Sequence, residues 1–292
     1  LEERLGTAGP PPRAHLRPEV EVVLIAGISG AGKSTLAAGQ AARGYERLNR
    51  DERGGTLGGI AAALDDRLAA GARRLVLDNT YVTRASRFAV LRSARRHGAR
   101  VRCIWVDTPL LEAQRNVIER MLRAHGRLLE PDELARGRDD PTRLSPRVLF
   151  AQARDQEPPE IEEGFDSIEP MPFERRPAAG LGGPGLAVAL EALQAAGPSL
   201  LDRGEPGPRL VFAWLPEAGS ALADATRGLA VETAICPHPA GPPTCWCRPP
   251  FPGLLLDFVH RQRVDPARLT VVGTSAAHRK LASAIGARFE EA

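Results

Sequence analysis

The residues best suited to chemistry form a glycine-rich loop early in the chain. Gly27-Ile-Ser-Gly-Ala-Gly-Lys-Ser34 fits the pattern GxxxxGK[ST]. In such a loop backbone N–H groups surround a phosphate, the lysine reaches the β- and γ-phosphates, and the final hydroxyl binds Mg²⁺. An apolar run precedes the loop and a helical pattern follows it, as the motif requires. We predict a site for a nucleotide and Mg²⁺ formed by Gly27, Ser29, Gly30, Ala31, Gly32, Lys33, Ser34 and Thr35.

Two acidic residues are candidates for a role at the site of the phosphate acceptor. No NKxD-type guanine motif is present, so ATP is the expected donor. A kinase needs a carboxylate to take the acceptor's proton. Asp51 follows an apolar segment expected to end at the ligand-binding edge of a sheet, and it is our candidate base; a solvated carboxylate paired with Arg50 or Arg53 is the alternative. Asp78 ends a buried strand, where it could hold Mg²⁺ through water or assist the acceptor. Capping a helix is the other role open to Asp78-Asn79-Thr80.

Two arginines are expected on a helix that begins near Pro109. Arg115 and Arg120 are five residues apart, which places them on neighbouring flanks of that helix. In phosphoryl-transfer enzymes such a helix often forms a lid whose arginines close over the nucleotide. A solvated helix face is the alternative, because arginine supplies nearly all of the 39 basic residues.

A second group of residues has metal-ligand spacing. Cys236-Pro-His238 and Cys245-Trp-Cys247 form the pattern C-x-H-x₆-C-x-C. Three thiolates and one imidazole complete a tetrahedral shell and suit structural Zn²⁺ without an open position for catalysis. The alternatives are a disulfide or unliganded cysteines. The remaining cysteine, Cys103, is expected to be a buried core thiol.

Strand-like and helix-like segments alternate along the chain. Strands are predicted at 20–26, 75–78 and 101–106, and helices at 34–42, 83–96 and 109–123. A second alternating block begins with a strand at 210–214, followed by strands near 231–235 and 269–273 and helices near 253–263 and 277–285. We predict an α/β protein with parallel sheets. The expected organisation is a mobile tail (1–19), a P-loop domain (20–177), a Gly/Pro linker with a short helix at 186–196 (178–208) and a smaller domain (209–292).

Composition excludes several classes of protein. A hydrophobic content of 43% is enough to build cores, so wholesale disorder is excluded. Aromatic residues make up 4%, which argues against a surface that binds bases mainly by stacking. The apolar runs are far shorter than the roughly 20 residues of a membrane span, and no signal sequence is apparent, so we expect a cytoplasmic protein without membrane partners. The net charge is +3, and this excess lies within residues 1–177, which weakly favours an anionic ligand there.

From about Val22 to Phe173 the chain resembles the kinase domain of the polynucleotide kinase-phosphatase family. The resemblance lies in the P-loop and in an ordered set of further motifs: Asn49-Arg50-Asp51, Asp78-Asn79-Thr80, Glu112-Ala-Gln-Arg115-Asn116 and Glu163-Gly164-Phe165. It implies that Asp51 activates a nucleic-acid 5′-hydroxyl, that Lys33 and Ser34 serve the phosphates and Mg²⁺, and that Arg115 and Arg120 belong to the lid. It also implies that the acceptor strand is bound by Arg50, Asp78, Asn79, Arg84 and Arg87. Phage-type members carry an arginine three residues after the base, where this chain has Gly54.

The block from Cys236 to Phe289 resembles the zinc loop of haloacid-dehalogenase-like phosphatases of the histidinol-phosphate type. Cys247-Arg248-Pro249-Pro250 and a Pro-Gly-Leu-Leu helix follow the family's order. That family uses an Asp-x-Asp pair at the end of its first strand, and residues 178–292 contain none. The family's phosphate-binding lysine is replaced by Pro249, and its Mg²⁺-binding acids by Thr274, Ser275 and His278. We expect a zinc-stabilised domain without phosphatase activity.

The leading hypothesis is a kinase for 5′-hydroxyl ends of DNA or RNA that uses ATP and Mg²⁺. A kinase for a small metabolite or nucleotide-sugar would use the same phosphate loop and lid. A non-catalytic, ATP-gated interaction module, docking a partner through the zinc domain, is the third possibility. That module would need neither Asp51 nor the lid arginines.

Overall fold

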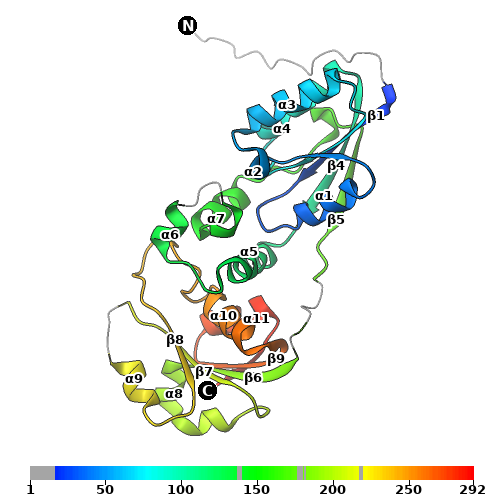
Figure 1. Ribbon diagram of the computed structural model, residues 1–292. Helices are drawn as coiled ribbons and strands as arrows, with labels where there is room; N and C mark the ends of the chain where they lie inside the picture. Colours follow the sequence, from blue (N-terminus) through cyan, green and yellow to red (C-terminus); the bar gives the residue numbers. More distant parts are fainter. Residues whose placement is uncertain (1–16, 137–139, 176–179, 181, 217–219) are drawn as a thin grey trace. The chain divides into compact units, whose positions relative to one another are not determined.

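The computed structural model describes residues 17–136, 140–175, 180, 182–216 and 220–292 (Figure 1). The chain divides into two compact units. The first holds the residues up to Ala113 and Leu149–Glu174, and the second holds Gln114–Val148 and Arg175–Ala292. Each unit has its own five-stranded parallel sheet, so the predicted α/β class is confirmed. The expected tail up to residue 16, and residues 178, 179 and 181 of the expected linker, lie outside the described residues.

The sheet of the first unit has the strand order β2-β3-β1-β4-β5. These strands are β1 (Arg17–Ala26), β2 (Glu46–Leu48), β3 (Arg74–Asp78), β4 (Ala99–Asp107) and β5 (Ser167–Pro172). The chain also forms α1 (Lys33–Ala41), α2 (Arg50–Arg53), α3 (Leu57–Ala69), α4 (Arg84–Arg96) and the 3₁₀ turn η2 (Ile161–Glu163). Because all five strands are parallel, their carboxyl ends share one edge, where β1 leads into the phosphate loop.

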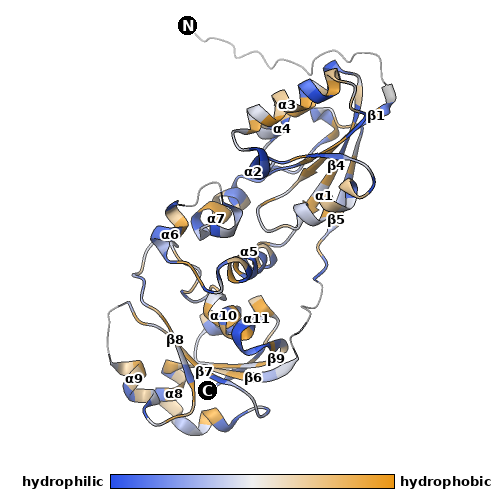
Figure 2. Ribbon diagram, viewed as in Figure 1, coloured by the Kyte–Doolittle hydropathy of each residue, from blue (hydrophilic) through white to orange (hydrophobic). Residues whose placement is uncertain are grey.

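Both faces of this sheet are buried, as a parallel sheet requires. Val22 and Leu24 of β1 pack in one core cluster with Ile60 and Leu64 of α3 and with other apolar side chains of α4. On the opposite face of the same strand, Val23 is fully buried as well. Figure 2 shows hydrophobic residues along the strands, and polar residues along the helices beside them.

The second sheet has the strand order β10-β9-β6-β7-β8. These strands are β6 (Gly183–Ala189), β7 (Arg209–Trp214), β8 (Glu232–Cys236), β9 (Val264–Gly273) and β10 (Arg288–Glu291). The helical segments between them in sequence are α8 (Leu190–Ala196), the 3₁₀ segment η3 (Pro198–Asp202), α9 (Ala221–Thr226), α10 (Gly253–Gln262) and α11 (Ala276–Ile285). Between β4 and β5 the chain forms α5 (Leu110–His125), α6 (Pro131–Arg136), the 3₁₀ turn η1 (Pro141–Arg143) and α7 (Pro146–Arg154).

The predicted helix at 186–196 is wrong over its first residues. Leu186, Val188 and Ala189 belong to β6, the middle strand of the second sheet, and the helix begins only at Leu190. The side chains from Leu186 to Ala189 are fully buried, so this strand lacks the polar alternation that identifies a half-exposed strand. The second sheet therefore begins before β7.

Residues 114–148 lie in the second unit, although the sequence predicts them within the P-loop domain. The unit boundary falls inside α5 and again inside α7. Among the described residues, the structure contains no helix with the length and apolar character needed to cross a bilayer.

Candidate nucleotide and metal sites

The loop between β1 and α1 has the backbone conformation of a phosphate-binding loop. Gly27, Gly30 and Gly32 have φ values of 151°, 77° and 96°. Residues other than glycine rarely adopt this backbone conformation. A Cβ on Gly27 would also lie 2.8 Å from the carbonyl oxygen of Val106, so β4 excludes any larger residue there. The loop is fixed from the same strand end by Thr108, whose hydroxyl donates to the Ala31 carbonyl at 3.0 Å.

The lysine of the loop is buried, whereas the hydroxyl side chains that follow it are exposed. The buried Lys33 spans the loop, because its Nζ donates to the Ile28 carbonyl at 2.7 Å. Ser34 and Thr35 are exposed in the first turn of α1. An exposed hydroxyl at the amino end of a helix suits Mg²⁺ and phosphate oxygens, so these residues fit the groups predicted for them.

A side chain that the motif does not contain also contacts this loop. The Oε1 atom of Gln152 accepts a hydrogen bond from the backbone N–H of Ser29 at 2.8 Å. Gln152 lies on α7, 123 residues further along the chain. Its amide oxygen therefore binds a backbone N–H group of the kind that binds phosphate in this motif. Nothing in the sequence identified Gln152.

Asp78 and Asn79 connect the end of β3 to the start of α2. Asn49 Nδ2 donates to the Asp78 carbonyl at 2.7 Å and to its carboxylate at 3.2 Å. Asn79 Oδ1 accepts from the backbone N–H of Arg50 at 2.7 Å. Arg47 also binds the carboxylate of Asp78, which is nearly fully buried, through Nε at 3.1 Å. This network holds α2 against β3. The binding of Mg²⁺ by Asp78 stays a prediction.

The capping alternative for Asp78-Asn79-Thr80 is wrong for the helix that follows them. Thr83 caps α4 instead, through a reciprocal pair of hydrogen bonds with Ser86.

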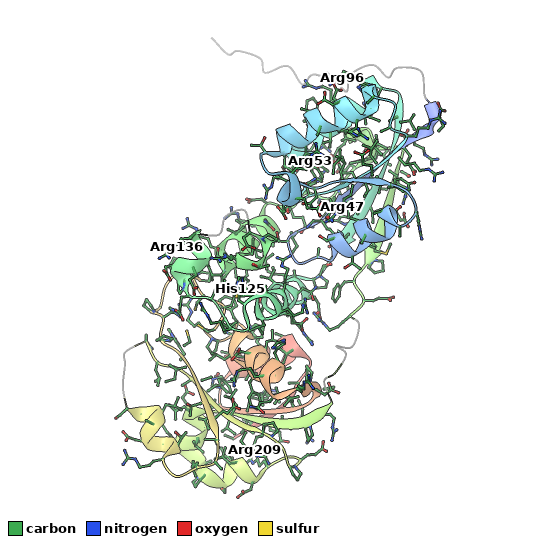
Figure 3. The ribbon with its side chains drawn as sticks, in the orientation of Figure 1. Arg47, Arg53, Arg96, His125, Arg136 and Arg209 are labelled. Atoms are coloured by element: carbon green, nitrogen blue, oxygen red, sulfur yellow. The ribbon has the colours of Figure 1, made fainter. Side chains whose placement is uncertain are left out.

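Asp51 lies in the first turn of α2, which Asn49 caps by accepting from Glu52 N at 3.1 Å. Its carboxylate is partly exposed and lies 3.5 Å from the guanidinium of Arg50. Arg53 belongs to this helix and Arg47 to the preceding strand β2 (Figure 3). Since β2 and β3 end at the same edge as β1, and Ile25 of β1 pairs with Asp78, Asp51 and the phosphate loop belong to one edge of the sheet.

The predicted acceptor arginines have different surroundings. Arg84 is exposed and pairs with Glu160. Arg87 is fully buried, and its guanidinium binds both carboxylate oxygens of Glu163 at 2.7 Å and the Glu157 carbonyl at 2.9 Å. This placement makes Arg87 part of the core, and we omit it from the proposed acceptor site.

The predicted lid arginines lie in the part of α5 that belongs to the second unit. Arg115 is buried; its guanidinium donates to Glu119 at 2.7 Å and to the Ile285 carbonyl at 2.9 Å. Arg120 is half-buried on the same helix. The Ile285 carbonyl is at the end of α11, where a cation interacts favourably with the helix dipole. A lid role for both arginines stays a prediction.

The four predicted metal ligands meet in space. All their ligand atoms lie within 4.8 Å of one another. Cys236 Sγ is 3.5 Å from His238 Nδ1 and 3.8 Å from Cys245 Sγ, and His238 Nδ1 is 3.2 Å from Cys247 Sγ. Tetrahedral zinc bond lengths imply about 3.8 Å between two sulfurs and about 3.6 Å between sulfur and nitrogen. The group therefore fits one metal ion, and none of these cysteines forms a disulfide.

The three thiols of the cluster differ in pKa: hydrogen bonds with the neighbouring thiols raise the pKa of Cys236 and that of Cys247. Hydrogen bonds from the Cys236 and Cys247 thiols lower the pKa of Cys245, which stabilises a thiolate. By contrast, Cys103 is fully buried, which confirms it as a core thiol, and this burial raises its pKa to about 12.

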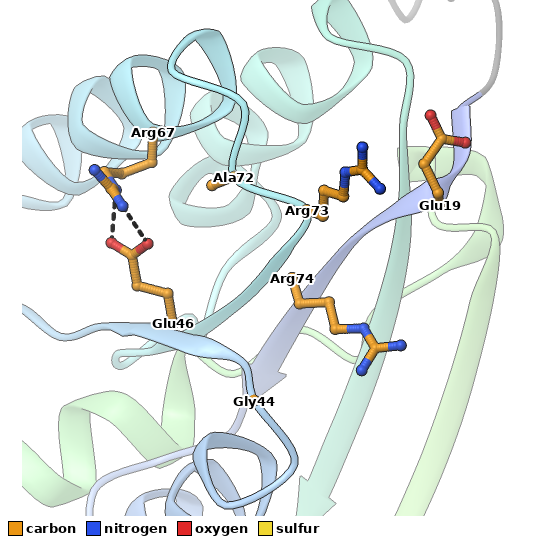
Figure 4. Close-up of a pocket in the computed structure, with 7 residues that line it drawn as sticks. All are labelled: Glu19, Gly44, Glu46, Arg67, Ala72, Arg73 and Arg74. Carbon is orange, nitrogen blue, oxygen red and sulfur yellow. Dashed lines mark hydrogen bonds and ion pairs between the residues drawn. The ribbon is translucent and has the colours of Figure 1, made fainter.

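A hollow of about 550 Å³ lies at the opposite edge of the first sheet (Figure 4). Glu19, Arg73 and Arg74 line it near the starts of β1 and β3, and Arg67 pairs there with Glu46. Ligands of parallel α/β sheets bind outside the carboxyl ends of the strands, so this hollow is separate from the nucleotide site.

Comparison with known proteins finds similarity over part of the chain. A protein-family profile described as an AAA domain matches residues 56–139. Similar solved structures include Kti12 from Chaetomium thermophilum in complex with ADP-AlF₃, at 15% identity and a TM-score of 0.39, covering 52% of this chain and 89% of that one.

Two further structures are similar at comparable levels. The APS kinase CysC from Mycobacterium tuberculosis is 17% identical with a TM-score of 0.32, and the match covers 55% of this chain and 92% of that one. A fungal RNA kinase is 10% identical with a TM-score of 0.37, with 71% of this chain and 95% of that one covered.

Proposed function

We propose that this protein is an ATP- and Mg²⁺-dependent kinase that phosphorylates the 5′-hydroxyl end of a polynucleotide. The observation that carries the proposal is the network of Asn49, Asp78 and Asn79, which fixes α2 to the strand beside β1. It supports a carboxylate, Asp51, held at the sheet edge where the phosphate loop begins. An RNA kinase, the class of enzyme proposed here, is also among the similar solved structures.

In the proposed reaction Asp51 accepts the proton of the 5′-hydroxyl. The hydroxyl oxygen forms a bond to the γ-phosphorus while the bond from that phosphorus to the bridging oxygen breaks, and ADP leaves. Lys33 and the loop N–H groups stabilise the negative charge on the phosphates. Bound Mg²⁺ would add positive charge at the same oxygens, and Ser34 with Asp78 would hold it. Arg50 and Arg84 are the proposed contacts to the acceptor strand.

We further propose that the second unit is a haloacid-dehalogenase-like domain without phosphatase activity, stabilised by Zn²⁺. Its first strand is β6, and the residues at its end are Ala189-Leu190-Glu191, without the Asp-x-Asp pair. At the end of β9 the imidazole of His278 accepts from Thr274 N at 3.3 Å, where the family has acids. The Cys/His group fits the zinc loop of that family.

An acceptor panel tests the kinase proposal. Purified protein with labelled ATP and Mg²⁺ is given 5′-hydroxyl DNA and RNA oligonucleotides, nucleosides and sugars. We expect label on the oligonucleotides, and we expect Asp51→Asn to lose about 10²–10⁴-fold in rate, the usual contribution of a general base. Asp66→Asn, an exposed carboxylate on α3, is the control and keeps the rate.

Other results of the panel identify the alternatives. Transfer only to nucleosides or sugars would make the protein a small-molecule kinase. Nucleotide binding without transfer to any acceptor would support the interaction module and overturn the assignment of Asp51.

A further inference from the structure

The loop that carries the Cys/His group contacts a segment far away in sequence within the same unit. Glu130, on the approach to α6, lies with Oε2 2.9 Å from His238 Nε2. The other ring nitrogen of His238, Nδ1, is the one that faces the cysteines. Metal-binding histidines usually donate their second N–H to a carboxylate, which fixes the tautomer and orients the ring. Glu130 has that position.

A second contact comes from the residue between two of the cysteines. Trp246 is almost completely buried, and its Nε1 donates to the carbonyl of Leu144 at 2.8 Å. Because Cys245 and Cys247 flank it, binding of both thiolates to one ion would fix the position of this indole. The ring also packs edge-on against Phe251, with centroids 5.7 Å apart.

Close packing at Gly253 adds a third contact. Its N–H donates to the Trp246 carbonyl at 3.1 Å, and a Cβ there would overlap that oxygen. The same Cβ would lie 3.1 Å from the Leu128 side chain. The start of α10, the cysteine loop and residue 128 therefore meet without space between them.

From these contacts we infer that the metal site fastens the described residues between 126 and 148 to the C-terminal sheet, with Glu130 as the outer partner of His238. The inference rests on the proposed metal site and not on kinase activity. Earlier in the chain, Arg115 of α5 binds the end of α11, so the helix that precedes this stretch has an attachment of its own. Loss of the metal would release the stretch from 126 to 148 while the attachment of α5 remains.

The experiment combines metal analysis with hydrogen–deuterium exchange on the full chain. Zinc-loaded and chelator-treated proteins are compared peptide by peptide. We expect one zinc per chain, and faster exchange after chelation in the described residues from 126 to 148 and in the 236–250 loop, with unchanged exchange in α3. Unchanged exchange from 126 to 148 would overturn the inference, and so would a loss of protection spread evenly over the second unit. A purified chain without zinc would reject the metal site itself.

Two variants test the contacts while leaving all four ligands in place. Glu130→Gln should weaken zinc affinity about 10–100-fold in a competition assay, the usual effect of losing such a partner. Trp246→Phe should keep zinc stoichiometry and affinity but speed exchange around Leu144. Asp132→Asn is the matched control: this exposed carboxylate of α6 pairs only with Arg136 among the interactions described, and it should change neither readout. Equal zinc affinity in Glu130→Gln and Asp132→Asn would reject the role of Glu130. None of these measurements requires phosphoryl transfer, so a failure here is distinct from a failure of the kinase proposal.

Discussion

The side-chain oxygen of Gln152 accepts a hydrogen bond from the backbone N–H of Ser29, inside the phosphate loop. The amide therefore satisfies a donor that a phosphate oxygen would otherwise use, and a nucleotide that binds Ser29 N must displace it. A protein hydrogen bond contributes about 0.5–1.5 kcal/mol net, which corresponds to roughly a two- to tenfold effect on binding.

The first prediction concerns this competition. Gln152→Ala should bind ADP about two- to tenfold more tightly than the unchanged protein, because Ser29 N is then available without displacement. Isothermal titration calorimetry measures the change. Gln156→Ala removes an amide beyond the end of α7 and serves as the control. Weaker ADP binding by Gln152→Ala would mean that the amide assists the nucleotide.

The second prediction concerns the position of Asp51. Asn49→Ala removes the cap of α2 and its link to Asp78, so kcat should fall at least tenfold while the KM for ATP changes little. Steady-state kinetics on a 5′-hydroxyl oligonucleotide provide both values. Thr56→Ala removes the corresponding cap of α3, a Gly59 N–Oγ1 bond of 3.2 Å, and should leave kcat unchanged. Equal losses in the two variants would point to a general loss of stability.

The third prediction concerns the buried ion pair of Arg87 and Glu163. Glu163→Gln leaves a guanidinium with no solvent exposure facing a neutral amide, and we expect the free energy of unfolding to fall by about 3–5 kcal/mol. Urea unfolding followed by circular dichroism measures it. Glu160→Gln removes the exposed partner of Arg84 and should cost about 1 kcal/mol or less. Similar values for the two variants would contradict a structural role for Arg87.

The fourth prediction concerns pH. Burial lowers the pKa of His278, with a smaller opposing effect from Glu191. Below about pH 6.5 the unfolded imidazole binds a proton that the folded one does not, so stability falls with pH until the lowered pKa is reached. This group contributes a slope of at most about 1.4 kcal/mol per pH unit. His278→Gln should flatten the decline between pH 7 and 5.5 in zinc-saturated protein.

The control for this measurement is His260→Gln, which changes an exposed histidine of α10. Its unfolding free energy should follow that of the unchanged protein at each pH. The same pH dependence in His278→Gln and in the unchanged protein would show that another group is responsible.

Short-range signals predicted much of this molecule. The phosphate loop and the Cys/His pattern were recognisable because each consists of neighbouring residues with a fixed spacing. The strands at 20–26 and 75–78 were recognisable because they are continuous apolar runs next to glycine or polar residues. These local patterns predicted the strands that correspond to β1, β3, β4, β7, β8 and β9, and they predicted that the four metal ligands meet.

The contacts that the sequence did not predict join residues that are far apart in the chain and are brought together by the fold. Gln152 is 123 residues from Ser29, and Glu130 is 108 residues from His238. Neither residue belongs to a motif. Strand β6 escaped prediction because its alanines and leucines suit a helix and its burial on both faces removes the strand period. The position of Arg115 against Ile285 likewise depends on which unit its helix joins.

Gly253 has a consequence for recognising related chains. It binds no metal, yet a methyl group there would push the Trp246 carbonyl and, with it, the two flanking sulfurs. Searches for this site should therefore extend the pattern beyond its last cysteine to a glycine six positions later. Some chains will keep the cysteines and histidine but carry a larger residue at that position. As metal becomes scarce, the cellular level of these chains should fall before the level of chains that keep the glycine.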